Sequence, residues 1–296
     1  MTKSKIDSTF SECFEMWYSR ILITAIDEEM ALNAAQSTVG FATSIIMCTA
    51  EAGIEKLIEK DQTPDGRPGV IIQIWTRSSK KMKDELLARI SQCAMTAPTT
   101  RIFNAVSEGT KSEPIGKLIS YFGDGYQKKG LYYDNRTMWE IPVMDGSFLI
   151  EETFGFSKGV AGGLLILIGE TKESTLGAAR IAIQAIKKSN VKAITSFPGG
   201  ICRSGSKIGS KYTFLNESTN HKYCPTLKDN IEDSHLPNSA HCVYEIVINA
   251  VSEDELKSAM KIAIKAVKDD KRILKITSSN FGGELGSIKI NLDELI

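Results

Sequence analysis

The sequence has no excess of charge of either sign and no apolar run long enough to cross a membrane. It holds 36 Lys and Arg against 36 Asp and Glu in 296 residues. This balance argues against the basic footprint of a nucleic-acid-binding protein, although it leaves a local basic pocket open. The longest apolar run, GVAGGLLILIG at 159–169, would span about 16 Å as a helix, roughly half of a bilayer core. We therefore expect neither a nucleic-acid partner nor a membrane span.

The sequence has no closely spaced cysteines, and we expect no signal peptide. The first ten residues, MTKSKIDSTF, lack the apolar segment of a signal peptide, so we expect a cytoplasmic protein. No C-x-x-C pair occurs, and scattered cysteines in a cytosolic chain are usually free thiols. The six cysteines are Cys13, Cys48, Cys93, Cys202, Cys224 and Cys242.

A strand–helix–strand pattern occurs four times along the chain. Apolar residues recur at helical spacing in each middle segment, and Ser252 followed by Glu255 predicts a capping box at the start of the last helix. In the first copy we expect strands at 20–25 and 44–50 around a helix at 27–38, and in the second, strands at 69–76 and 93–97 around a helix that begins at 79. In the third copy we expect strands at 162–170 and 193–197 around a helix that includes 176–186, and in the fourth, strands at 243–250 and 274–279 around a helix that begins at 252.

Four such copies predict an α+β protein with two ferredoxin-like lobes, each built from two split β-α-β units. We place an N-terminal lobe at 1–145, with a hairpin excursion, and a C-terminal lobe at 146–296. The hairpin is predicted by Asp145-Gly146 between the alternating runs WEIPVM and SFLIEE. The alternative is a single doubly wound parallel sheet.

The connection at 198–242 in the C-terminal lobe is too long to be a simple turn. Loops beyond about 15 residues in a compact domain are usually functional or disordered. This one holds all three histidines and three of the six cysteines, and Tyr212, Phe214, Leu215 and Tyr223 are expected to anchor it. We therefore expect it to line a site.

A glycine pair and a basic, hydroxyl-rich segment open this loop. Paired glycines after a strand let backbone N–H groups approach a ligand, and Ser and Lys donate to oxyanions. The alternative is a tight turn with a solvated basic rim, and the spacing is not that of a Walker loop. The candidate binding residues are Gly199, Gly200, Arg203, Ser204, Ser206 and Lys207. A similar pair, Gly282-Gly283, follows the fourth copy and favours a structural remnant of the repeat.

The histidines and cysteines of the loop admit a zinc site or a thiol nucleophile. His221 lies near Cys224, but no second closely spaced pair exists, so we expect no metal. Cys202 or Cys224 paired with His221 would suit acyl transfer, whereas most scattered cysteines are buried small hydrophobes.

Glu245 is the most unusual carboxylate, because its neighbours in VYEIVI are all apolar or aromatic. A carboxyl group buried without a partner keeps its proton to a higher pH, which is how a general acid near pH 7 is made. The alternatives are a solvated strand edge or pairing with a Lys.

Ordered motifs from about residue 7 to the final DELI resemble the formylmethanofuran–tetrahydromethanopterin formyltransferase family. The resemblance departs from the usual family residues at Thr49, Leu164, Leu165, Cys202 and Arg203. The matching segments are DSTFSECFEMWYSRILITA, GFATSIIMCTAEAGIE, TPDGRPGVIIQI, QCAMTAPT, YFGDGY, GVAGG, SFPGG, SGSKIGS, TNHKYCPTLK, VYEIVIN and LKITSSNFGGELG.

The resemblance implies a cytoplasmic acyltransferase of one-carbon metabolism and methanogenesis that reversibly moves a formyl group between two carriers, methanofuran and tetrahydromethanopterin. It implies a homo-oligomer, commonly a tetramer, without metal or bound prosthetic group, and it places the acid/base glutamate at Glu245. Asn220 and His221, with the backbone near Gly199-Gly200, become candidate donors to the carbonyl oxygen. Arg203, Lys207, Lys211 and Lys222 become candidate contacts for the anionic carriers. Two alternatives remain: a non-catalytic scaffold paralogue in a one-carbon enzyme complex, and a small-molecule sensor.

Overall fold

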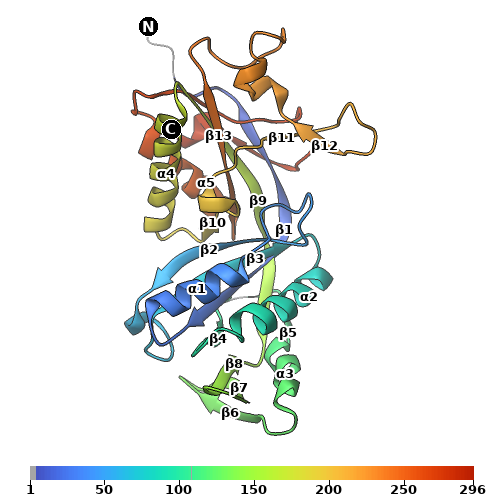
Figure 1. The fold of residues 1–296 in the computed structure, drawn as a ribbon, viewed down its shortest axis with the longest axis vertical. Helices are drawn as coiled ribbons and strands as arrows, with labels where there is room; N and C mark the ends of the chain where they lie inside the picture. Colours follow the sequence, from blue (N-terminus) through green and yellow to red (C-terminus); the bar gives the residue numbers. More distant parts are fainter. Residues whose placement is uncertain (1–4, 108) are drawn as a thin grey trace. The chain divides into compact units, whose positions relative to one another are not determined.

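The computed structural model describes residues 5–107 and 109–296, which form two compact units (Figure 1). One unit, here the N-terminal unit, is Met16–Gly159, and the other, the C-terminal unit, combines Met1–Glu15 with Val160–Ile296. The units divide after Glu15 and after Gly159, so strands β1 (Phe10–Thr24) and β9 (Phe154–Gly169) each continue from one unit into the other. Residues 1–4 of the segment in which we expect no signal peptide lie outside the described residues.

The N-terminal unit contains the first two copies of the repeat. In its sheet β2 (Glu51–Ile58), β3 (Gly69–Thr76), β1 and β4 (Arg101–Asn104) lie in that order, all antiparallel. Helices α1 (Glu28–Thr38) and α2 (Ser79–Arg89) contribute buried residues to one core with these strands. Numbered along the chain, the strand order is 2-3-1-4, which is the split β-α-β arrangement.

A further set of elements extends this sheet. Strand β8 (Gly146–Glu151) pairs parallel with β4, and β7 (Arg136–Val143) and β6 (Lys128–Tyr132) follow antiparallel. The predicted hairpin at Asp145-Gly146 is confirmed as the β7–β8 connection. Strand β5 (Lys111–Glu113) pairs with the first residues of β9, and the short helix α3 (Ile115–Ser120) follows it.

The C-terminal unit contains the third and fourth copies. Strands β14 (Ile273–Thr277), β9, β13 (Cys242–Ala250) and β10 (Ala193–Ile194) lie in the order 4-1-3-2 and are antiparallel. Helices α4 (Lys172–Lys188) and α5 (Glu253–Val267) pack together with this sheet, and β15 (Ile288–Asn291) pairs with the start of β1. The ferredoxin-like α+β prediction is confirmed, and the doubly wound parallel alternative is wrong because the repeat strands pair antiparallel.

Helix starts follow the capping signals in the sequence. The Ser252 side chain accepts a hydrogen bond from the Glu255 backbone N–H at 3.2 Å, as the capping box predicts. Asp27, Ser78 and Thr171 cap α1, α2 and α4 in the same way.

Two expected strands are wrong. Residues 44–50 form turns with Met47 exposed, and the strand begins one residue later at Glu51. Apolar content was misleading there, because the true strand buries the charged Glu55 by pairing it with Arg20 and Gln73. Cys93 and Ala94 instead belong to a π-helical turn, Ile90–Ala94, that continues α2, and residues 95–97 form the turn after it; Ile90 and Ala94 lie in the core.

The two faces of the C-terminal sheet are covered differently. Ile246, Ile248 and Ala250 of β13 face the helices. On the opposite face Ile166 and Ile168 pack against Leu236 and Ala240 from the 198–242 loop. This loop contains a two-stranded hairpin of β11 (Ser206–Ile208) and β12 (Glu217–Thr219). Its anchors are thus Tyr223, Leu236 and Ala240, whereas the expected anchors Tyr212, Phe214 and Leu215 are exposed.

Within the described ranges, no helix is both long and apolar enough for a membrane span.

Candidate active site

Glu245 lies on β13, where the alternation of the strand places it opposite the helix-facing residues. Its Cα is in register with Ile166 of β9, and its neighbour Ile246 projects to the other side, into the core with the helices. The side chain is half-buried. The carboxyl group therefore lies on the sheet face that carries Ile166 and that the long loop covers.

The long loop closes over Glu245 by pairing with the strand. The backbone N–H of Cys202 donates to the carbonyl of Glu245 at 2.8 Å, and the N–H of Glu245 donates to the carbonyl of Cys202 at 2.9 Å. Gly205 follows with a φ of 54°, and a Cβ atom there would lie 3.2 Å from the Glu245 Oε1 atom. Glycine thus favours both the positive φ of the turn and the close approach to the carboxyl group.

Burial raises the pKa of Glu245 to about 7, and a hydrogen bond from the Cys202 side chain opposes that rise. Among the described residues no cation contributes to this pKa, so the alternative of a Glu–Lys pair is not seen. A carboxyl group that titrates near neutrality can deliver and recover a proton at physiological pH.

A cavity of about 430 Å³ opens beside this carboxyl group. It brings together four of the sequence-predicted site residues: Arg203, Ser204, Asn220 and Glu245. The loop supplies most of the remaining wall, and Lys172 at the start of α4 adds a second cation. The 198–242 loop, which we expect to line a site, thus lines this cavity.

Asn220 is the buried polar group of the wall. Its side-chain N–H donates to the Ser279 Oγ atom at 3.1 Å, and its backbone N–H donates to the carbonyl of Gly205 at 3.3 Å. These bonds fix the amide next to the Gly205 turn. Its place in the wall keeps it a candidate donor to a substrate oxygen.

The glycine pair does not line this cavity. The N–H of Gly200 donates to the carbonyl of Phe197 at 2.7 Å, and a Cβ atom on Gly200 would meet Thr195 and Ile183. Gly199 is exposed with a φ of 63°. This geometry is that of the tight turn, and it corrects the expectation that the Gly200 N–H is available to a ligand.

The other predicted binding residues lie outside the cavity wall. Ser206 and Lys207 belong to the β11–β12 hairpin, where the Lys207 Nζ atom donates to the carbonyl of Gly209 at 3.2 Å. Lys222 pairs with Asp233 at 3.1 Å, and the His221 Nε2 atom lies 4.0 Å from the same carboxyl group. They form a basic rim on the loop, so contact with a substrate requires the substrate to extend beyond the cavity.

The metal and thiol alternatives find no matching geometry in the described part of the chain. No group of three His, Cys, Asp or Glu residues there could hold a metal ion. All six cysteines are free. Cys224 contacts the Thr219 hydroxyl and the carbonyl of Asn220, and Cys202 contacts Ser204, so neither thiol has His221 as its hydrogen-bond partner.

The second glycine pair has a structural explanation. The carboxylate of Glu12 accepts hydrogen bonds from the backbone N–H groups of Phe281, Gly283 and Leu285. The turn at 281–285 is therefore wrapped around a buried carboxylate of β1. Nothing in the local sequence indicated this pairing across about 270 residues.

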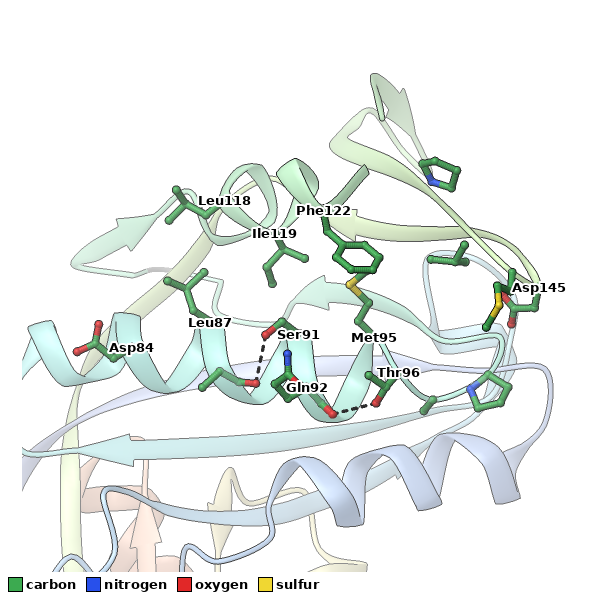
Figure 2. Close-up of a pocket in the computed structure, with 16 residues that line it drawn as sticks. Asp84, Leu87, Ser91, Gln92, Met95, Thr96, Leu118, Ile119, Phe122 and Asp145 are labelled. Carbon is green, nitrogen blue, oxygen red and sulfur yellow. Dashed lines mark hydrogen bonds between the residues drawn. The ribbon is translucent and has the colours of Figure 1, made fainter. Parts of the chain in front are cut away.

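A larger cavity lies in the N-terminal unit and was missed by sequence reasoning. It has a volume of about 1360 Å³ between the end of α2 and the α3 segment. Figure 2 shows Leu87 and Met95, from α2 and the turn that follows it, pointing into this space. Ile119 and Phe122, from α3 and the turn that follows it, point into the same space. Its lining includes residues of the quoted motifs QCAMTAPT and YFGDGY, which were the available signal.

Comparison with known proteins shows the family of the chain. Residues 1–143 match the family model for formylmethanofuran-tetrahydromethanopterin formyltransferase, and residues 146–295 match the model for the proximal lobe of the same enzyme. The chain belongs to this formyltransferase family. The two matched ranges meet near the boundary expected from the sequence, while the compact units divide at 159/160.

The formyltransferase relatives match along their whole length. The enzyme of Methanocaldococcus jannaschii is 46% identical over 98% of this chain and 97% of its own length. That of Methanothermobacter thermautotrophicus is also 46% identical, over 98% of both. Among solved structures, the Methanosarcina barkeri formyltransferase is 42% identical, covers 100% of this chain and 99% of its own, and has a TM-score of 0.96. A chain of the Methylorubrum extorquens formyltransferase/hydrolase complex FhcABCD with methylofuran is 39% identical, with a TM-score of 0.92 over 98% and 96%.

Proposed function

We propose that this formyltransferase moves a formyl group from formylmethanofuran to a ring nitrogen of tetrahydromethanopterin, reversibly, with both carriers as substrates. Support comes from relatives of that name at 43–46% identity over nearly the whole chain. The observation that carries the mechanism is the Glu245 carboxyl group, which has a pKa raised to about 7 and faces a cavity of the C-terminal unit.

The chemistry of the transfer defines what the site must provide. The ring nitrogen attacks the formamide carbon, and negative charge develops on the formyl oxygen as the tetrahedral intermediate forms. That oxygen needs hydrogen-bond donors, and the departing amine needs a proton, because an unprotonated amide nitrogen is a poor leaving group. Proton transfer by a positioned acid contributes roughly a hundred- to ten-thousand-fold.

Glu245 is the proposed general acid. Its proton passes to the amine of methanofuran as the C–N bond breaks, and the resulting carboxylate recovers a proton from the ring nitrogen that has become acylated. The side-chain amide of Asn220 lies in the same cavity wall and is the proposed donor to the formyl oxygen. His221 and Gly199 stay weaker candidates for that role because they lie outside the wall.

The basic groups around the cavity have an electrostatic task in a chain of zero net charge. Arg203 and Lys172 line the cavity itself. Ser204 and Ser206 add hydroxyl donors, and Lys207, Lys211 and Lys222 extend the basic rim along the loop. We propose that these groups bind the anionic parts of the carriers, which would lower the Michaelis constants rather than accelerate the chemical step.

We further propose a cytoplasmic homo-oligomer, in the form of a tetramer, that acts in one-carbon metabolism and methanogenesis. We propose lobes at 1–145 and 146–296, and the two family models, which match residues 1–143 and 146–295, support this division. A second candidate is a scaffold subunit of a larger one-carbon complex. It is favoured by the similarity to a chain of the FhcABCD complex.

One assay separates the two candidates. Purified protein is mixed with formylmethanofuran and tetrahydromethanopterin, and the formylated pterin is measured. An active enzyme forms it catalytically, and a folded chain that forms none supports the scaffold candidate. The matched control is the Glu245→Gln variant, which keeps the side-chain shape but cannot deliver a proton.

A further inference from the structure

The surroundings of Glu245 contain one hydrogen-bonding group that the reaction as proposed does not use. Cys202 is buried, and its two backbone hydrogen bonds to Glu245 make the residues a directly paired couple across two antiparallel segments. Side chains of such a pair project to the same face and lie close together. The geometry of the backbone therefore fixes the thiol beside the carboxyl group.

A second contact restrains the thiol itself. The Cys202 Sγ atom lies 3.2 Å from the Ser204 Oγ atom, and Ser204 also lines the cavity. If the Ser204 hydroxyl donates to the sulfur, the S–H is free to donate to the carboxylate. The turn at Gly205, whose Cβ position would be 3.2 Å from the Glu245 Oε1 atom, closes the other side of the carboxyl group. Cys202 and Gly205 of the loop thus lie next to Glu245, and Ser204 contacts the thiol of Cys202.

We propose that Cys202 is a positioning residue for Glu245, whose thiol, held by the Ser204 hydroxyl, donates a hydrogen bond that fixes the carboxyl group for proton transfer. This inference rests on the proposed formyl transfer. It assigns no covalent role to the thiol, since no acyl group is carried on sulfur. A donor to the charged form also favours that form, in agreement with the lowering effect of Cys202 on the Glu245 pKa.

Other titratable groups line the cavity and share the environment of this couple. The cationic or basic ones are Lys172, Arg203 and His241. The weakly acidic ones are Cys224, Cys242, Tyr223 and Tyr244. On the sheet beneath, β9 presents the apolar residues Leu164, Ile166 and Ile168. Lys275 of the neighbouring β14 is paired with Asp7 at 2.8 Å. None of these groups changes in a Cys202 variant, so a shift in titration reports on the thiol.

The test compares Cys202→Ala and Cys202→Ser with the wild-type protein. Activity of the acid form is lost as pH rises through the Glu245 pKa, so removing the thiol should move the alkaline limb of kcat to higher pH. We expect a shift of about one pH unit, a tenfold change in the proton affinity of the carboxyl group, with KM within about threefold. Ser restores a donor, so Cys202→Ser should return the limb to the wild-type position or below it.

Two further measurements keep the result interpretable. Cys13→Ala removes another buried thiol of the C-terminal unit, which contacts Ser11 and not the cavity, and it should keep the wild-type limb. Titration of the protonated carboxyl band in the infrared difference between wild type and Glu245→Gln gives the same pKa without turnover. An alkaline limb and a band that are unmoved in Cys202→Ala overturn the proposal. Absence of transfer by the wild-type protein overturns the proposed function instead, while the infrared titration still tests the Cys202 contact.

Discussion

Replacing Glu245 by Gln should have two separate effects, because the raised pKa of Glu245 affects both the turnover of the enzyme and the stability of the fold. Gln has the same shape and is neutral at every pH, so it cannot supply the proton that the departing amine requires. Turnover should fall by roughly a hundred- to ten-thousand-fold, with little change in KM for either carrier.

The same substitution has an effect on stability that can be worked out from the structure. The folded pKa of about 7 lies above the ordinary value of 4.5, so protonated Glu245 stabilises the fold fully below pH 4.5. That contribution is lost as pH rises through 7, because the carboxylate must then be held half-buried. A shift of this size corresponds to about 3 kcal/mol at pH 8. Glu245→Gln escapes this penalty, so it should be more stable than wild type by up to that amount at pH 8 and equal at pH 4.5.

Both effects can be measured on one preparation. Steady-state kinetics across pH gives the loss of turnover, and urea unfolding at several pH values gives the free energy of unfolding. Near-wild-type turnover with an unchanged pH profile would refute the role of Glu245 as the acid. A stability difference that does not grow between pH 4.5 and 7 would refute the raised pKa.

Three other changes test different parts of the molecule. Cys202→Ala/Cys224→Ala should retain transfer within roughly tenfold, and a loss of several orders of magnitude would revive a covalent thiol route. Lys207→Ala should raise KM for at least one carrier, and high ionic strength should mimic it because salt screens a contact at this partly exposed side chain; unchanged kinetics for both carriers would remove Lys207 from the site. Glu12→Ala leaves the N–H groups of Phe281, Gly283 and Leu285 without their acceptor, so the free energy of unfolding in urea should fall by about 2–4 kcal/mol; a change below about 0.5 kcal/mol would contradict the wrapped-turn interpretation.

The repeat was visible in the sequence because hydrophobic spacing is a local property. Strand 69–76 was predicted with correct bounds because it is a continuous apolar run, and the start of α5 was predicted because Ser252 marks it and one face of the helix is apolar. The two wrong strands show the limit of that signal. The apolar residues of 93–97 follow from a helix that ends in a π-helical turn at Ala94, and 51–58 is a strand although it carries charges.

Only part of the candidate site could be predicted from the sequence. A lone carboxylate in an apolar strand identified Glu245, because alternation and burial can be read locally. The bridge from Cys202 to Glu245 joins residues 43 positions apart, and no local pattern encodes it. The Gly199-Gly200 pair predicted backbone N–H groups available to a ligand, but a tight turn uses the same residues as an anion-binding loop. The apolar cavity lined by Met95 and Phe122 was hidden because its two walls are distant in the chain.

The most direct test of the account is the transfer assay with purified wild-type protein and both carriers. We predict that formylmethanofuran is consumed in equal amount to the formyl-tetrahydromethanopterin formed. We also predict that kcat falls at high pH with an apparent pKa near 7 in the wild-type enzyme. A folded protein that forms no formylated pterin at any pH would contradict the proposed function, and transfer whose rate is the same on both sides of pH 7 would contradict the role of Glu245.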